Sequence, residues 1–130
     1  WLHITGGEPT DQAEGLARLI QLARRERLRI HLQTAGLTQV DLPCDWITVS
    51  PKVPARKLHQ RKGSELIVVF DGQEVEVLRD YEQTSFWHYF LQPMWVGEKA
   101  ANTRATVAAA HALGSDWRIT LQAHKYLNVY

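Results

Sequence analysis

The amino-acid sequence predicts an α/β fold, with residues 1–130 forming a single domain of parallel strands joined by crossovers. Two observations support this. Short apolar runs alternate with runs of helical periodicity, and the order strand, helix, strand implies a parallel pair. Each apolar run also ends in a cluster of polar or special residues. In an α/β barrel the residues that follow the strands share one rim, which holds the active site, so we expect these clusters to converge.

The first strand is expected near residues 1–5 and runs into the turn Thr5-Gly6-Gly7-Glu8-Pro9. Two glycines let the backbone approach a ligand closely, and the proline opens a helix. A carboxylate beside bare N–H groups suits a small zwitterionic ligand, because the carboxylate takes its ammonium and the backbone takes its oxygens. An ordinary tight turn is the alternative interpretation.

A helix follows this turn, with Thr10 or Asp11 as its cap. Its apolar positions form one buried stripe, at Ala13, Leu16, Ala17, Ile20 and Ala23. The next strand, at residues 29–33, alternates and leads into Gln33-Thr34-Ala35-Gly36. A short buried strand at 46–49 then delivers Ser50-Pro51-Lys52.

The middle of the chain contains its clearest strand. Residues 53–63 are rich in basic side chains with little periodicity, and they predict a mobile basic loop. The apolar run 65–70 is a strand stopped by the turn pair Asp71-Gly72. Residues 75–81 fit either a short helix or an irregular crossover.

The last third repeats the pattern of strand and polar cluster. An aromatic-rich strand at 87–91 ends in Gln92-Pro93-Met94. The alanine-rich segment 98–113 is a helix that stops before a glycine. The final strand, at 117–121, leads to Gln122-Ala123-His124-Lys125.

Composition argues against several classes of partner. The formal net charge is +1, and the densest basic group, Arg24-Arg25-Glu26-Arg27, suits a solvated helix face better than a nucleic-acid patch. No run of 18 apolar residues predicts a membrane span. The sole cysteine, Cys44, excludes an internal disulfide and fits a reducing, cytoplasmic compartment. Because the chain begins at Trp1, inside an expected strand, we expect it to be a cut piece of a longer protein.

Four motifs together resemble one enzyme family. Thr5-Gly6-Gly7-Glu8-Pro9 resembles the glycine-glycine-glutamate motif of radical S-adenosylmethionine (SAM) enzymes. Combined with Ser50-Pro51-Lys52, Gln92-Pro93-Met94 and the ending from Gln122 to Asn128, it is similar to the 7-carboxy-7-deazaguanine synthases over nearly the whole chain. The resemblance implies a partial (β/α)6 TIM-like barrel of the radical SAM type. This chain would be its C-terminal part, with the N-terminal strands missing.

The resemblance also implies a reaction. Such a lyase converts 6-carboxy-5,6,7,8-tetrahydropterin to 7-carboxy-7-deazaguanine with loss of ammonia, in the biosynthesis of queuosine for tRNA modification or of another deazapurine. It implies SAM, a 4Fe–4S cluster and Mg²⁺ as cofactors, a homodimer, and a reducing partner such as flavodoxin. The cluster-binding CxxxCxxC segment does not occur in these residues, and one cysteine cannot hold a cubane cluster. We therefore expect the cluster and Mg²⁺ ligands upstream, and the 130-residue chain alone to be inactive.

Carried over position by position, the resemblance implies two sets of site residues. The expected cofactor-binding residues are Gly7, Glu8, Ser50, Pro51, Lys52, Gln92, Pro93 and Met94. The expected substrate-binding residues are Thr5, His124, Lys125 and Tyr130. No catalytic or metal-ligating residue is expected within the chain. Gln33-Thr34-Ala35-Gly36 departs from the family's Glu-Thr-Asn-Gly, which removes a carboxylate and an amide from this turn.

Two other classes stay open at this stage. A non-radical α/β-barrel enzyme for a phosphorylated metabolite would use the same rim, although no glycine-rich phosphate loop opens a helix here. A non-catalytic remnant of a radical SAM barrel, which binds a nucleoside-like ligand or a partner, is the stronger alternative because the cluster cysteines are absent from the chain.

Overall fold

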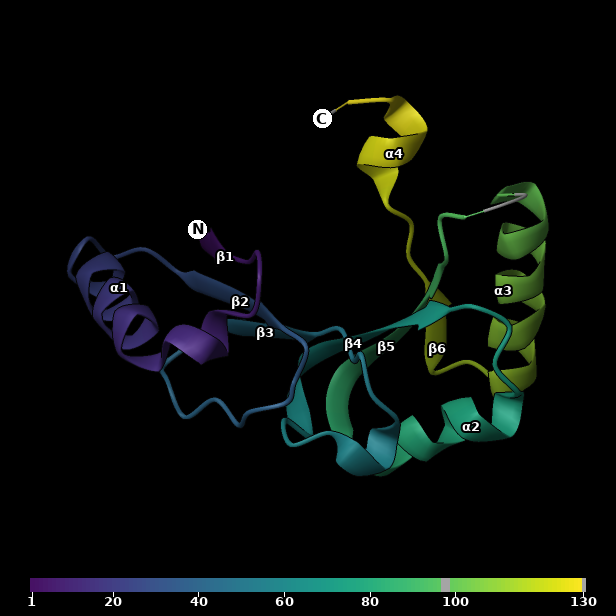
Figure 1. Cartoon of the computed structure of the whole chain (residues 1–130), viewed down its shortest axis with the longest axis horizontal. Coiled ribbons are helices and arrows are strands. Elements are labelled where there is room, and N and C mark those ends of the chain that lie inside the picture. Colours follow the sequence, from purple (N-terminus) through teal and green to yellow (C-terminus); the bar gives the residue numbers. More distant parts are fainter. Residues whose placement is uncertain (97–98, 130) are drawn as a thin grey trace.

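The computed structural model describes residues 1–96 and 99–129, and its centre is one parallel sheet (Figure 1). The strands are β1 (Leu2–Ile4), β2 (Ile30–Thr34), β3 (Trp46–Val49), β4 (Lys62–Phe70), β5 (Ser85–Pro93) and β6 (Trp117–Ile119). They lie in sequence order, and every neighbouring pair is parallel. The predicted α/β class and parallel strands are confirmed, whereas the predicted partial barrel is not: the described strands do not close on one another. Within the described residues the sheet is open, with β1 and β6 at its edges.

Helices lie between the strands along the chain. The α-helices are α1 (Ala13–Arg25), α2 (Val75–Arg79), α3 (Lys99–Leu113) and α4 (Ala123–Leu127), and the 3-10 helices are η1 (Pro9–Gln12), η2 (Ala55–Lys57) and η3 (Asp80–Gln83). In Figure 1, α1 lies beside β1 and β2, whereas α2 and α3 lie at the other end of the sheet, near β5 and β6. No helix of the described residues is both long and apolar enough to cross a membrane.

The helices bury one face of the sheet. Along β2 the buried residues alternate, and Ile30 and Leu32 pack with Leu16 and Ile20 of α1. A second cluster joins β4 and β5 to α2 and α3, with Leu66, Val68, Leu78, Leu91, Ala110 and Leu113 among its members. Strand residues alternate between faces, so the residues between the buried positions belong to the opposite face. That face carries polar, aromatic and aliphatic side chains, most of them half-buried.

The start of the first helix differs from the prediction. Glu8, not Thr10 or Asp11, is the cap: its backbone is extended and its carboxylate accepts a hydrogen bond from the Thr10 backbone N–H. Pro9 occupies the first position of η1, where its missing N–H costs nothing. The α-helix itself begins only at Ala13.

The predicted basic loop at 53–63 is irregular over most of its length, but it is more structured than expected. It contains η2, and β4 already begins at Lys62. Gln60 is only 1% exposed; its side-chain oxygen accepts from the Val40 N–H at 2.7 Å, and its backbone N–H donates to the Gly36 carbonyl at 3.0 Å. The buried Gln60 amide, together with the backbone bonds of His59 and Gln60 to the Gly36 carbonyl, thus holds a segment whose sequence shows little periodicity.

The structure also decides the two segments for which a helix was considered or predicted. Residues 75–81 are helical, forming α2 and the start of η3. The alanine-rich helix is present as α3 from Lys99 onward, and residue 98 of the predicted helix lies outside the described residues.

Candidate functional site

A small cavity of about 120 Å³ lies where the first three strands end. Its lining residues are Thr5, Gly6, Gly7, Gln33, Thr34, Ala35, Ser50 and Lys52. These residues lie at the end of β2 or in the segments that follow β1, β2 and β3. They meet because the carboxyl ends of parallel strands lie at one edge of the sheet. We call this space the rim cavity. It brings together Thr5, Gly7, Ser50 and Lys52 of the residues predicted from sequence.

The glycine turn after β1 needs both of its glycines. Gly6 has φ of +85° and Gly7 has φ of +52°, in the left-handed region that residues with a Cβ rarely adopt. A Cβ at either position would meet no atom within 4 Å, so the requirement is for backbone conformation and not for space. The turn carries the backbone from β1 across the edge of the sheet to Glu8.

The Glu8 carboxylate joins the first turn to the second. Oε1 accepts from the Thr10 N–H at 3.2 Å, the Thr10 hydroxyl at 2.8 Å and the Thr34 hydroxyl at 2.7 Å, and Oε2 accepts from the Ala35 N–H at 2.6 Å. Thr34 is 3% exposed and its hydroxyl also accepts from the Gly36 N–H at 3.0 Å. Because each carboxylate oxygen has about two acceptor sites, Oε2 retains one for a further donor.

The charge of Glu8 is stabilised by these contacts. Burial of the carboxyl raises its pKa, but the hydrogen bonds from Thr34, Ala35 and Thr10 outweigh burial and hold the pKa below the ordinary value. Glu8 is therefore ionised at neutral pH, and a negative charge lies beside the rim cavity.

Ser50 and Lys52 place a hydroxyl and an ammonium at the same cavity. The Ser50 N–H donates to the Thr34 carbonyl at 2.9 Å, which ties the loop after β3 to the end of β2. Lys52 is exposed, and its Nζ donates to the Ser50 hydroxyl at 3.5 Å. In the described part of the chain Lys52 forms no ion pair, so its ammonium is available to an anionic ligand.

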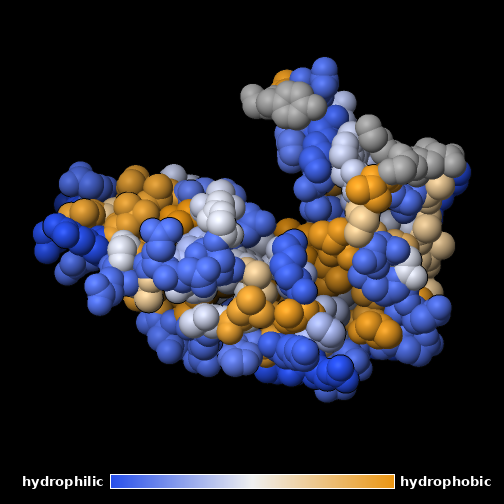
Figure 2. All heavy atoms as spheres, in the orientation of Figure 1, coloured by the Kyte–Doolittle hydropathy of each residue, from blue (hydrophilic) through white to orange (hydrophobic). Residues whose placement is uncertain are grey.

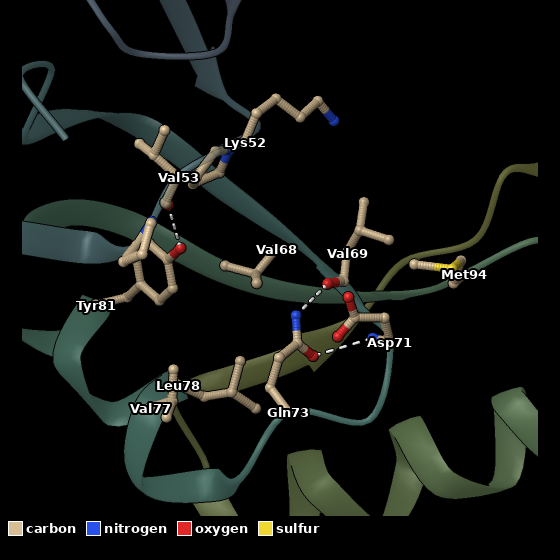
Figure 3. Close-up of a pocket in the computed structure, with 12 residues that line it drawn as sticks. Lys52, Val53, Val68, Val69, Asp71, Gln73, Val77, Leu78, Tyr81 and Met94 are labelled. Carbon is tan, nitrogen blue, oxygen red and sulfur yellow. Dashed lines mark hydrogen bonds between the residues drawn. The ribbon is translucent and has the colours of Figure 1, made fainter. Parts of the chain in front are cut away.

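A second and larger cavity of about 440 Å³ adjoins Lys52 (Figure 3). Pro51, Lys52 and Met94, all predicted site residues, line it together with Val69 and with side chains of α2 and η3. Figure 3 shows Gln73 bracing the turn after β4: its amide nitrogen donates to the Val69 carbonyl at 2.8 Å and its oxygen accepts from the Asp71 N–H at 3.0 Å. We call this space the β4 cavity.

Gln92 and Pro93 differ from the prediction in their location. They lie within β5, pairing in register with Val69 and Phe70, and so belong to the strand and not to a loop after it. Met94 is the first residue beyond the strand. The loop that follows is held by Asn102, whose amide donates to the carbonyls of Met94 at 3.0 Å and Val96 at 2.7 Å.

The predicted substrate residues near the C-terminus do not line the rim cavity. His124 and Lys125 belong to α4, which stands apart from the sheet in Figure 1 and is largely hydrophilic on the face shown in Figure 2. Tyr126 packs against Trp95 with ring centroids 4.7 Å apart, and the Lys125 ammonium lies 5.8 Å from the same ring. Tyr130 lies outside the described residues.

Sequence reasoning missed several residues that shape the two cavities. Thr34 and Ala35 were expected at the rim as part of a polar cluster, but their hydrogen bonds to Glu8 were not foreseen. Asp71 was interpreted only as a turn residue, and Gln73 and Asn102 carry no motif. The polar residues directly after the strongest strand were the one signal that could have marked Asp71 and Gln73.

The described residues do not fit an iron–sulfur cluster. Burial raises the pKa of the Cys44 thiol, the effect of Arg24 being smaller, so that this half-buried group remains protonated at neutral pH. No group of three or more His, Cys, Asp or Glu side chains in residues 1–96 and 99–129 is arranged to hold a metal ion.

The fold and the rim cavity define an α/β protein with a polar cavity at the carboxyl ends of its parallel strands, the edge at which open α/β sheets bind ligands. No protein-family model matches the chain. Curated proteins do match it. The chain is 35% identical over 130 residues to the 7-carboxy-7-deazaguanine synthase of Bordetella pertussis, and the alignment covers 99% of this chain and 59% of that protein. It is 35% identical to the synthase of Burkholderia multivorans and 36% identical to that of Caulobacter vibrioides, with 96% of this chain and 57% of each relative covered.

These comparisons show that the chain is homologous to the 7-carboxy-7-deazaguanine synthases, as its motifs indicate. It spans 57–59% of the length of these curated relatives.

Proposed function

We propose that this chain forms the SAM-binding part of a 7-carboxy-7-deazaguanine synthase, a radical SAM lyase that converts 6-carboxy-5,6,7,8-tetrahydropterin to 7-carboxy-7-deazaguanine with loss of ammonia. The rim cavity is the observation that carries the proposal. Residues far apart in sequence, from Thr5 to Lys52, meet there at the ends of three strands. The similarity to named synthases supports the same assignment.

The residues at the two cavities suit the parts of SAM. Its amino-acid end is a zwitterion: the Lys52 ammonium and Ser50 hydroxyl would take the carboxylate, and the free acceptor site on Glu8 would take the ammonium. The rim cavity alone is too small for the whole molecule. The adenosine would extend over Lys52 into the β4 cavity, where Pro51, Val69 and Met94 provide apolar surface. Thr5 would face the pterin.

The complete reaction needs groups that these residues do not supply. In this proposal the cluster that cleaves SAM, and the Mg²⁺, are ligated by residues outside the chain, since the donor set is absent from the described residues. The proposal includes a homodimer and a reducing partner such as flavodoxin. A non-catalytic remnant that binds a nucleoside-like ligand or a partner is the second candidate, favoured by the single half-buried cysteine.

The test is equilibrium binding of SAM to the purified chain and to its Lys52→Ala variant. A charge-assisted hydrogen bond contributes about 1.5–3 kcal/mol, so we expect the variant to bind SAM roughly ten-fold to a hundred-fold more weakly. Lys57→Ala is the matched control, because Lys57 is an exposed lysine of η2 that lines neither cavity. Equal affinity in Lys52→Ala and Lys57→Ala would contradict the assignment of Lys52.

A further inference from the structure

A second layer of polar side chains lies beneath the rim cavity on the same face of the sheet. Side chains two residues apart on a strand share a face and are separated by about 6–7 Å along it. His31 is two residues before Gln33, and Thr48 is two residues before Ser50. Gln33 and Ser50 both line the rim cavity. His31 does not itself line the rim cavity, so a ligand would reach it by extending from that cavity along this face toward the middle of the sheet.

Hydrogen bonds run from His31 across two strands to Glu65. The Nε2 atom of His31 is 2.7 Å from the Thr48 hydroxyl oxygen, and that hydroxyl donates to Oε1 of Glu65 at 2.6 Å. A threonine hydroxyl has one hydrogen. Because Thr48 gives this hydrogen to a carboxylate, its oxygen can only accept from His31, and Nε2 must carry a proton. The neutral ring is thereby fixed in one tautomer, with the lone pair on Nδ1.

Nδ1 has no hydrogen-bond partner among the described residues and is not fully buried. No buried side-chain nitrogen or oxygen in the described residues lacks a hydrogen-bond partner, and the His31 contact that the structure shows uses Nε2 alone. The ring itself is held in place. It stacks on His3 at 4.1 Å with an angle of 6° between the planes, and Trp46 presents an edge to it at 6.4 Å.

The charges around His31 support a neutral ring that can still take up a proton. Burial lowers its pKa, and His3 on β1 lowers it further, whereas Glu65 on β4 raises it. On β3 the neighbours are the neutral Trp46 and Thr48, and His88 of β5 lies beyond Trp46, with ring centroids 6.1 Å apart. Glu65 would thus stabilise the imidazolium through Thr48, at the opposite side of the ring from the incoming proton.

We propose that His31 accepts a proton from an N–H or O–H group of a ligand that is held in the rim cavity and extends along the sheet to His31, with Thr48 and Glu65 as positioning residues that fix its tautomer. The bond from the ligand's heteroatom to hydrogen breaks, its electron pair stays on the ligand, and a new N–H bond forms at Nδ1. Only the identity of the ligand, a pterin or SAM, rests on the function proposed above. The tautomer and the proton uptake are properties of this chain.

The test is nitrogen-15 NMR of the chain labelled at histidine, recorded as a function of pH. We expect His31 to show a single Nε2–H tautomer in its neutral form. Thr48→Val should give a mixture of both tautomers, while Glu65→Gln, which can still accept from Thr48, should keep the tautomer and shift the titration of His31 to lower pH. Thr38→Val is the matched control at an exposed threonine and should change neither. Equal populations of the two neutral His31 tautomers in the unmodified chain, or unchanged tautomer populations in Thr48→Val, would overturn the proposal.

A second arm uses 6-carboxy-5,6,7,8-tetrahydropterin and SAM as probes. A shift of the His31 Nδ1 resonance on addition of either probe, lost in Thr48→Val, supports the proton-accepting role; an unchanged resonance while the amides of Gly7 and Ser50 shift would refute it. If those rim amides also stay unchanged, the function proposed above fails, and the tautomer measurement still decides the positioning by Thr48 and Glu65.

Discussion

At the scale of single residues, Glu8 has more partners than a ligand contact requires. Its carboxylate accepts four hydrogen bonds, from Thr10, Thr34 and Ala35, and so connects the glycine turn after β1 to the turn after β2. Thr34 both donates to Glu8 and accepts from Gly36. The position that would bind the ammonium of SAM is therefore also the position that holds two walls of the rim cavity together.

Replacement of Thr34 by valine should weaken this connection. The variant removes a hydrogen bond to a charged group and leaves the Gly36 N–H without its partner, so we expect a loss of about 1–3 kcal/mol in the free energy of unfolding at pH 7. Urea unfolding monitored by circular dichroism measures it. Thr38→Val, at an exposed site, serves as the control and should lie within about 0.5 kcal/mol of the unmodified chain.

The same variant should change the dependence of stability on pH. The folded-state pKa of Glu8 lies below its unfolded value, so its contribution is complete above the unfolded pKa and is lost as the pH falls through the folded pKa. The difference between Thr34→Val and the unmodified chain should accordingly narrow below about pH 4. A difference that is constant from neutral to acidic pH would show that the bond of Thr34 to Glu8 adds no stability, and that Thr34 acts through Gly36 and packing.

At the scale of elements, β4 and the segment before it organise the middle of the molecule. β4 pairs with β5 over most of its length, and its buried residues Leu66, Val68 and Phe70 belong to the larger core cluster. Just upstream, Gln60 bonds Val40 through its oxygen and the Lys62 carbonyl through its nitrogen. Through Gly36, this segment also contacts the turn that forms one wall of the rim cavity.

Replacement of Gln60 by alanine should loosen this segment. The substitution leaves the Val40 N–H and the Lys62 carbonyl without their partner, and we expect a cost of about 1–3 kcal/mol. Amide hydrogen exchange at Val40 should speed up accordingly. Gln39→Ala is the matched control, because Gln39 is exposed and bonds only to the nearby Asp41 among the described residues. Unchanged exchange at Val40 would mean that the backbone bonds to Gly36 hold the segment without the side chain.

At the scale of the whole molecule, the chain presents a sheet with two open edges and a projecting C-terminal helix. β1 and β6 each have one neighbouring strand within the described residues. In α4 and beyond it, Leu127 is 71% exposed and Val129 is 55% exposed. An exposed strand edge and exposed apolar side chains are surfaces that further chain or a partner can cover. Under the proposed function, we expect other parts of the complete synthase to cover these edges and apolar side chains.

The chain alone should release no 5′-deoxyadenosine from SAM. The described residues provide no set of thiolates for a cluster, so supplying iron, sulfide and a strong reductant under anaerobic conditions should not produce cleavage. A longer form that carries an upstream CxxxCxxC segment should produce it. Cleavage by the chain alone would refute the argument about the cluster, and none by the longer form would favour the non-catalytic remnant.

The sequence by itself determined the class of fold, the positions of the strands along the chain and the meeting of three of the five polar clusters that it predicted to converge. Apolar runs, helical periodicity and turn residues are local signals, and parallel strands necessarily bring their carboxyl ends to one edge. Thr5, Gly7, Ser50 and Lys52 could therefore be placed together without coordinates. The family resemblance, which rests on the same clusters, was likewise within reach of the sequence.

Only the tertiary structure decided which side chains hold those clusters in place. The deciding contacts join residues that are 17 or more positions apart in the sequence. They are the bonds of Glu8 to Thr34 and Ala35, the bond of Gln60 to Val40, and the bonds from His31 through Thr48 to Glu65. The physical reason is that a polar side chain forms the same kinds of hydrogen bond wherever it lies. Its partner is set by the register between strands and by the packing of loops, which no local pattern records.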